Sequence, residues 1–138
     1  MTKLSDEELT DYYHHTLFPN VTITASPNDG CVHIFRTEPD VDDPEKCTFE
    51  YMALIPDIEG VKEVGTITGM RPIEEAPLEE LTYGGDSVGD FVDEDLSVAV
   101  HQQRGLRSRG YRDACLAEQE SRVRRFHEVL NDYLEGRR

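Results

Sequence analysis

The first half of the chain alternates hydrophobic and polar positions with the two-residue period of strands. Within residues 13–25, Val21 and Ile23 alternate with threonines, as expected of a strand with one packed and one wetter face. Two further runs rich in β-forming residues follow, and turn-forming residues separate them. We therefore predict an antiparallel meander over about residues 13–56. Its three strands are expected at 13–25, 31–39 and 46–56, with turns at 27–30 and 40–44.

Helical patterns occupy the two ends of the chain. Ser5, followed three residues later by Glu8, predicts a capping box that opens a short helix over residues 4–11. From Asp90 an apolar stripe with helical period runs to about Arg104, which predicts a helix over about residues 90–104. A last helix is expected at about residues 115–135, because its apolar residues recur at the three- and four-residue steps of an amphipathic helix lying on a sheet. These residues are Leu116, Val123, Phe126, Leu130, Tyr133 and Leu134.

The middle of the chain follows neither period for long. Prolines, glycines and acidic pairs interrupt residues 57–89, so we predict a loop region with one short strand at 61–68. The elements together predict the α+β class, with an antiparallel sheet packed on a long C-terminal helix.

Charge is distributed unevenly along the chain. The net charge is −15 over 138 residues; residues 1–100 carry 5 basic and 23 acidic side chains, a net −18, and residues 101–138 carry 9 and 6, a net +3. Such acidity excludes nucleic acid and anionic membrane as partners, because binding phosphate requires cations. The C-terminal basic residues alternate with acidic ones at helical spacing, which predicts a solvated, ion-paired helix face.

Composition also bounds the compartment. Hydrophobic residues make up 37% of the chain, enough for one modest core, and no apolar run approaches the roughly 20 residues that span a bilayer. The acidic N-terminus is unlike a signal peptide, so we expect a soluble, cytoplasmic protein. Cys31, Cys47 and Cys115 are widely spaced and form no metal-binding pair, so we expect buried or half-buried free thiols.

Two stretches carry a family resemblance. In residues 15–56, Phe-Pro-Asn at 18–20 precedes a strand, and Phe35-Arg36 leads to Asp43-Pro44. In residues 92–134, an acidic pair opens a helix, Gln-Arg-Gly-Leu-x-Ser follows at 103–108, and a glutamate-containing helix carries Phe126-His127. These roughly 85 of the 138 residues resemble the C-terminal part of the catalytic domain of the large (alpha) subunit of Rieske-type, aromatic-ring-hydroxylating non-haem iron oxygenases.

The resemblance implies a fold and a chemistry. It implies a helix-grip (START-like) fold, with residues 1–138 as a single partial catalytic domain. It implies a mononuclear Fe(II) held by two histidines and one carboxylate, a set that leaves positions open for oxygen and substrate. A separate [2Fe–2S] centre and a reductase or ferredoxin supply electrons in the full enzyme. The substrate is a small organic compound, aromatic in many members, that is hydroxylated or demethylated.

Matched onto this chain, the carboxylate ligand falls on Asp95. Asp95 shares a helix face with Val92 and Ala99, so we expect its side chain to point inward from an apolar surface. The alternative is that Asp93, Glu94 and Asp95 are acids of a first helical turn, where they interact favourably with the helix dipole.

The family's histidine pair and Rieske motif do not occur in this chain. His14 and His15 superficially resemble the histidine motif, but the residue five positions after His14 is a proline, so we assign both to a strand. His33 and His101 are isolated, and His127 lies on the core-facing stripe of the last helix. We therefore expect no catalytic iron and no turnover from the chain alone, with an upstream chain supplying the missing ligands. Two alternatives are a non-catalytic helix-grip module that binds an apolar small molecule or a partner chain, and an acidic docking protein.

Overall fold

The computed structural model describes residues 5–25, 30–66, 68–73, 80–82 and 84–137. They belong to two compact units, Met1–Val100 and His101–Arg138, and each unit is described by itself. The first unit contains an antiparallel sheet, a small hairpin and helix, and the second is helical, so the predicted α+β class is confirmed. Among the described residues, no helix has the length and apolar character needed to cross a membrane.

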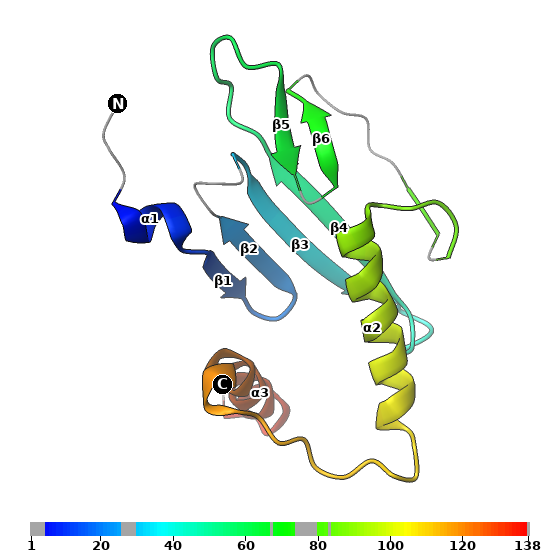
Figure 1. Cartoon of the computed structure of the whole chain (residues 1–138). Coiled ribbons are helices and arrows are strands. Elements are labelled where there is room, and N and C mark those ends of the chain that lie inside the picture. The colour runs from blue at the N-terminus through cyan, green and yellow to red at the C-terminus, as the bar shows by residue number, and fades with distance from the viewer. Residues whose placement is uncertain (1–4, 26–29, 67, 74–79, 83, 138) are drawn as a thin grey trace. The chain divides into compact units, whose positions relative to one another are not determined.

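Four strands form the main sheet, and they follow one another in sequence order (Figure 1). The prediction of three strands was wrong in number, because residues 13–25 fold back on themselves and Leu17 pairs with Val21. Strand-like residues lie on both sides of the reversal, so the sequence pattern alone did not show that the chain turns back between Leu17 and Val21. The strands are β1 (Tyr13–Leu17), β2 (Val21–Ala25), β3 (Val32–Pro39) and β4 (Cys47–Leu54).

The reversal between β1 and β2 explains part of the Phe-Pro-Asn motif. The Phe18–Pro19 peptide bond is cis, and Pro19 has no N–H to donate to a ladder. Asn20 then fastens the turn to β3: its side-chain amide donates to the carbonyl of Thr37 at 2.8 Å, and its own carbonyl accepts the Thr37 N–H at 3.1 Å. The asparagine thus sets the position of the β1–β2 hairpin along β3.

β1 is an open edge of the sheet. Among the described residues it pairs only with β2, and all five of its residues are exposed. Its sequence, Tyr-His-His-Thr-Leu, contains neither a proline nor an acidic, lysine or arginine side chain, and its register with β2 is continuous. Prolines, charged side chains and bulges are the features by which natural edge strands discourage further pairing. Their lack leaves the β1 edge chemically ready to receive another strand.

The predicted loop region contains a second, two-stranded sheet. β5 (Glu63–Thr66) corresponds to the strand expected at 61–68, and β6 (Gly69–Pro72) was not expected. The sequence did not predict β6 because glycine and proline, which lie at its two ends, are typical of loops. Residues 67 and 74–79, and all of the turn predicted at 27–30 except Gly30, lie outside the described residues.

The first two helices begin close to the predicted positions, whereas the last begins at Ser121, six residues after the predicted start at about 115. In α1 (Asp6–Thr10), the Ser5 hydroxyl accepts from the Glu8 N–H at 3.2 Å and the Glu8 carboxylate accepts from the Ser5 N–H at 2.8 Å, so the capping box is confirmed. Hydrogen bonding of the Glu8 carboxylate to Ser5 lowers the pKa of Glu8, the Ser5 backbone N–H most and its hydroxyl less. The other helices are α2 (Asp90–Leu106), the 3-10 turn η1 (Glu118–Glu120) and α3 (Ser121–Leu134). The packing of α3 on the sheet, and with it the helix-grip fold, stays a prediction.

The core of the described residues is small. Its buried hydrophobic side chains are Cys31, Val64 and Val92, joined by the polar residues Thr24 and His33. By contrast, nineteen large hydrophobic side chains are exposed in the same set, among them Leu17, Met52 and Phe91. Four of these exposed side chains, Tyr13, Leu17, Met52 and Leu54, lie on the four-stranded sheet.

Candidate functional site

The acidic cluster at the start of α2 is divided by its hydrogen bonds. The Asp93 carboxylate accepts from the Ser87 hydroxyl at 2.6 Å and from the Val88 N–H at 3.2 Å. Ser87 in turn accepts from the Gly89 N–H at 3.1 Å, and the Asp93 N–H donates to the Gly89 carbonyl at 3.0 Å. Both oxygens of Asp93 are therefore committed to holding the loop that leads into α2. Glu94 and Asp95 are the members of the cluster left for other chemistry.

Asp95 is exposed on α2, which corrects the expectation that it points inward beside Val92. Val92 is 3% exposed, while Ala99, expected on the same inner face, is exposed. The other residues of α2 that are at least half-buried lie on the opposite flank of Val92, at Asp93, Leu96, Ser97 and Val100. The sequence showed which residues share a side of the helix but not which side is covered. Whether Asp95 binds a metal is a separate question, and that role stays a prediction.

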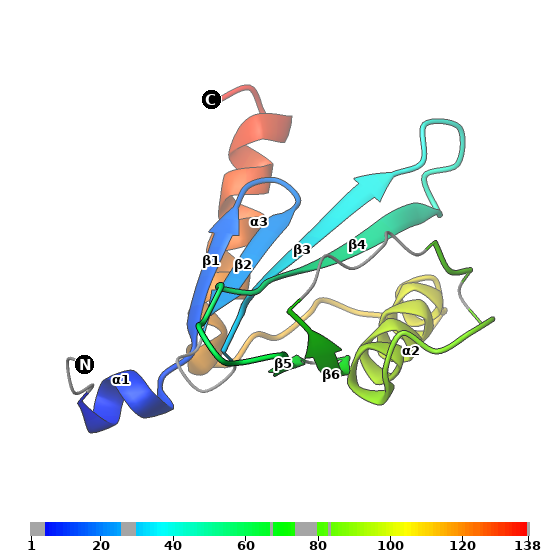
Figure 2. The ribbon, with the colours of Figure 1, turned by 90° about the horizontal axis from the view of Figure 1, so that it is seen from above.

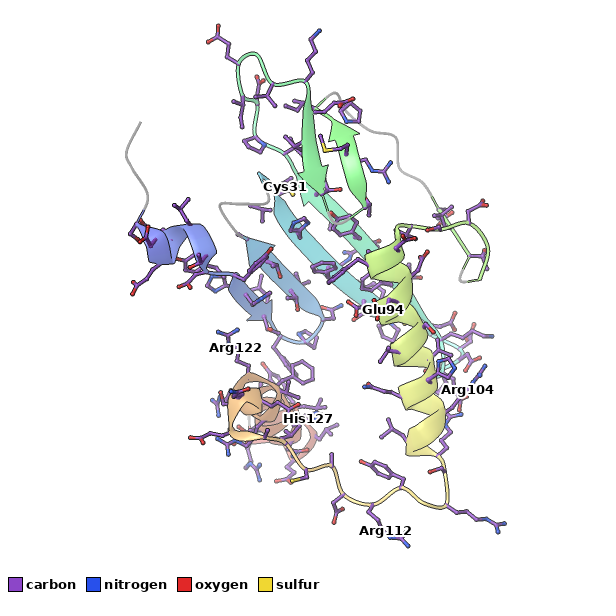
Figure 3. All side chains as sticks on the ribbon, viewed as in Figure 1. Cys31, Glu94, Arg104, Arg112, Arg122 and His127 are labelled. Atoms are coloured by element: carbon purple, nitrogen blue, oxygen red, sulfur yellow. The ribbon has the colours of Figure 1, made fainter. Side chains whose placement is uncertain are left out.

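Asp95 lies within an apolar stripe. At about 100° per residue, Phe91 four positions before it and Val98 three positions after it fall on the same side of the helix. Phe91 is 62% exposed and Val98 is 49% exposed. Asp95 thus borders two large hydrophobic side chains that remain exposed within the described residues. Glu94, labelled in Figure 3, lies three positions after Phe91 and four before Val98, so it flanks the same pair from the other side.

The described residues do not form a complete iron site. Within them, no group of three or more histidine, cysteine, aspartate or glutamate side chains is arranged to hold a metal ion. His14 and His15 lie on β1 as assigned, and Nδ1 of His14 hydrogen-bonds the Thr24 hydroxyl at 2.9 Å. His127, expected to be packed, is exposed and meets the ring of Phe126 edge-on.

Sequence reasoning missed a buried polar cluster around His33. His33 is 1% exposed, its Nδ1 lies 2.9 Å from the Tyr51 hydroxyl, and its ring stacks on those of Phe35 and Tyr51. Phe35 and Tyr51 are paired across β3 and β4, which sets Tyr51 diagonally opposite His33. The signal was present as aromatic residues at alternate positions on both strands, but it required the register between them.

The contact between Cys31 and His33 is a packing contact. The Cys31 sulfur lies 3.4 Å from Nε2 and 3.8 Å from Nδ1 of His33. The Cys31 thiol also lies 3.8 Å from the carbonyl oxygen of Gly65. A sulfur packed against an aromatic ring is a favourable contact. Cys31, labelled in Figure 3, is buried as expected, whereas Cys47 and Cys115 are exposed, contrary to expectation.

The opposite face of β3 carries an ion pair. The Arg36 guanidinium donates from Nε to one oxygen of Glu50 at 2.8 Å and from Nη2 to the other at 2.9 Å, across directly paired positions of β3 and β4. The hydrogen bonds to Glu50 raise the pKa of Arg36 further above its ordinary value. This pair fixes the register of the two long strands.

A shallow hollow lies beside the β5–β6 hairpin. It encloses about 580 Å³ and is lined by Ile55, Asp57, Val61, Lys62, Glu63, Pro72 and Ile73. Charges of both signs line it, and no buried polar group converges on it, so it lacks the features of a specific ligand site.

Comparison with known proteins gives the family. The family model described as "Ring hydroxylating alpha subunit (catalytic domain)" matches residues 1–136. The comparisons with curated proteins and with solved structures gave no significant match. The matched region covers nearly the whole chain, including Asp95 and the Gln-Arg-Gly-Leu-x-Ser segment. This chain belongs to the family of ring-hydroxylating alpha subunits, in the part that forms the catalytic domain.

Proposed function

We propose that this chain is the carboxylate-bearing part of a ring-hydroxylating oxygenase catalytic domain. In this proposal Asp95 is the single carboxylate ligand of a mononuclear Fe(II), and two histidines from another stretch of polypeptide complete the set. The iron, when bound, would supply the oxygen-activating chemistry for hydroxylation or demethylation of a small organic, aromatic substrate. The family implies an electron-donating component such as a reductase or ferredoxin.

The proposal is supported by the family match over residues 1–136, which singles out Asp95 from Glu94, and by the position of Asp95 beside the exposed side chains of Phe91 and Val98. A hydrophobic stripe of this kind is stable when another protein surface covers it, and covering it would remove Asp95 from water. An ionised carboxylate taken out of water is costly unless a cation or strong hydrogen-bond donors compensate it. A divalent metal ion with two neutral imidazoles supplies such compensation. Asp93, whose oxygens are already engaged, does not offer the same opportunity.

The residues of this chain have defined tasks in this arrangement. Ser87, Val88 and Asp93 hold the start of α2 in one orientation, so the side chain of Asp95 leaves the helix in a fixed direction. Phe91 and Val98 flank it and, once covered, would keep water away from the carboxylate. The chain contributes one ligand, which is too few to retain Fe(II) against water. We therefore expect the isolated chain to be inactive.

The test compares the chain alone with the chain completed by another polypeptide. Anaerobic equilibrium dialysis of the purified chain against Fe(II) should leave no stoichiometric iron bound. Co-expression with a polypeptide carrying a Rieske domain and the two histidine ligands should give iron-loaded protein and reductant-driven oxygen uptake. Asp95→Asn should abolish iron loading in that complex, while the matched Glu94→Gln should leave it unchanged.

Two results would contradict the proposal. Tight binding of one Fe(II) by the chain alone would show that its own residues form the site. Equal iron loading in the wild-type and Asp95→Asn complexes would show that another group is the carboxylate ligand.

A further inference from the structure

The main sheet has β1 at one border and β4 at the other, and β1 lies in a stretch without charged side chains (Figure 2). Residues 12–28 contain no aspartate, glutamate, lysine or arginine, and they are the longest such stretch in the chain. The remainder of residues 1–100 therefore carries the whole net charge of −18. The β1–β2 hairpin is the part of this unit that another acidic molecule can approach with least repulsion.

The outer edge of β4 is less suited to such an approach. Glu50 lies within β4, Glu45 and Lys46 directly precede it, and Asp57 follows a few residues later. A second copy of this chain that paired along β4 would bring its own carboxylates close to these. Like charges on directly opposite positions destabilise strand pairing. Of the two borders, β1 is thus the one that an acidic molecule can share with another copy of itself.

The main chain of β1 has hydrogen-bonding groups on its outer side. Among the described residues β1 pairs on one side, with β2, in a continuous register from Tyr13↔Ala25 to Leu17↔Val21. In an antiparallel ladder, alternate residues direct both N–H and C=O to the same side, so β1 also directs such groups away from β2. All five residues of β1 are exposed. An exposed row of these groups is a template for another strand.

We propose that β1 of one copy pairs antiparallel with β1 of a second copy, so that two four-stranded sheets join edge to edge. The antiparallel register that pairs all five residues of both strands sets His15 opposite His15 of the other copy. It also sets Tyr13 opposite Leu17 and His14 opposite Thr16. Residues 13, 15 and 17 share one face of the sheet and residues 14 and 16 share the other, so each pair extends a face that the sheet already has. The proposal is independent of the iron chemistry.

The charges next to β1 favour the antiparallel direction. Asp11 precedes β1, and α1 before it carries three more carboxylates in its first turn, whereas the turn at residues 18–20 is uncharged. In the antiparallel register, Asp11 of each copy lies near Pro19 of the other. A parallel register would set the two Asp11 residues side by side, and like charges in that position repel. The two strands therefore meet with their acidic ends apart.

The contact is small, so we expect a weak dimer. Stable interfaces bury about 1,200–2,000 Å² in total, which is more than two five-residue strands share. Repulsion between two molecules of charge −15 opposes the pairing, and salt screens that repulsion. Dimerisation should therefore strengthen as salt is raised from about 0.02 M to about 0.5 M. A contact formed by opposite charges would weaken over the same range.

Sedimentation velocity of the full chain over a concentration series tests the dimer. At about 0.5 M salt and up to about 0.5 mM protein, the wild type should pass from monomer to dimer. His15→Lys sets two ammonium groups opposite each other and should weaken dimerisation about tenfold or more. The matched control Thr48→Lys adds the same charge at an exposed position of β4 and should dimerise as the wild type does.

Disulfide cross-linking tests the register and direction of the pairing. The exposed cysteines are first removed (C47S/C115S), which leaves the buried Cys31. In that background His15→Cys should form a covalent dimer on mild oxidation, because directly opposite Cβ atoms lie about 4.5–5.5 Å apart. Tyr13→Cys alone should stay uncross-linked, since Leu17 of the other copy lies opposite it. A mixture of Tyr13→Cys and Leu17→Cys should cross-link.

Four results would overturn the proposal. The first is a wild-type chain that stays monomeric at every protein and salt concentration. The second is equal dimerisation of His15→Lys and Thr48→Lys, which would place the contact away from β1. The third is a His15→Cys variant that forms no covalent dimer. The fourth is cross-linking of Tyr13→Cys with itself, which would show a parallel arrangement.

Discussion

The hydrogen bond between His33 and Tyr51 offers a direct measure of how the sheet is stabilised. Tyr51→Phe removes one oxygen and keeps the ring that contacts Phe35 at 5.4 Å and His33 at 5.9 Å between centroids. The loss falls on Nδ1 of His33, whose side chain is 1% exposed, so water cannot replace the hydroxyl. An unsatisfied polar group in such a site costs about 1–3 kcal/mol. We therefore expect the unfolding equilibrium constant to rise roughly 5- to 150-fold.

Urea unfolding at pH 7, followed by circular dichroism, measures this change. The control is Tyr13→Phe, which removes the same atom from an exposed position on β1 and should change the free energy of unfolding by less than about 0.5 kcal/mol. The slope of free energy against urea should be the same in the wild type and both variants. Equal midpoints for Tyr51→Phe and Tyr13→Phe would refute the reasoning, because they would show that His33 does not depend on the Tyr51 hydroxyl.

Three further results are expected. The pKa of Glu8 is lowered, most by the Ser5 N–H and further by the Ser5 hydroxyl, so the cap of α1 stabilises the folded chain at neutral pH and is lost as pH falls through the lowered pKa. In an NMR titration, Ser5→Ala should raise this pKa part of the way towards its ordinary value, because alanine removes the hydroxyl and keeps the N–H. A pKa that does not rise would contradict the contribution of the hydroxyl. Gly30→Ala should destabilise the fold by about 1 kcal/mol because Gly30 has φ +62°, while Gly105→Ala in α2 should be neutral or stabilising in the same thermal melt. Raising the salt concentration should raise the unfolding temperature, because the net charge of −18 on residues 1–100 is screened; a fall in that temperature would count against charge repulsion as a destabilising factor.

Local patterns in the sequence predicted the local structure well. The capping box at Ser5 and Glu8, the strands at β3 and β4, and the helices α2 and α3 each depend on residues close together in the chain. The β1–β2 reversal was missed because the strand pattern continues through Pro19 on both sides. β6 was missed because Gly69 and Pro72 are turn formers, and only pairing with β5 makes them part of a strand.

The candidate site was harder to predict, because it depends on what covers each surface. Periodicity placed Asp95 on a helix, and the family resemblance assigned its role, but the covered side of α2 is set by contacts distant in sequence. The partnership of His33 with Tyr51 required the register of β3 with β4, which no single strand reveals. Asp93 and Asp95 are alike in the sequence, and only hydrogen bonds to Ser87 and Val88 distinguish them.

The open β1 edge has a consequence for how a larger catalytic domain is assembled. A strand added there would pair with β1 through main-chain N–H and C=O groups. Because every sequence has these groups, main-chain pairing alone places little restriction on the sequence of the added strand. Its side chains would still have to continue the two faces set by Tyr13, His15 and Leu17 on one side and by His14 and Thr16 on the other. Produced without such a segment, the chain would expose a template for amyloid-like stacking, so its solubility should improve when a completing strand is supplied.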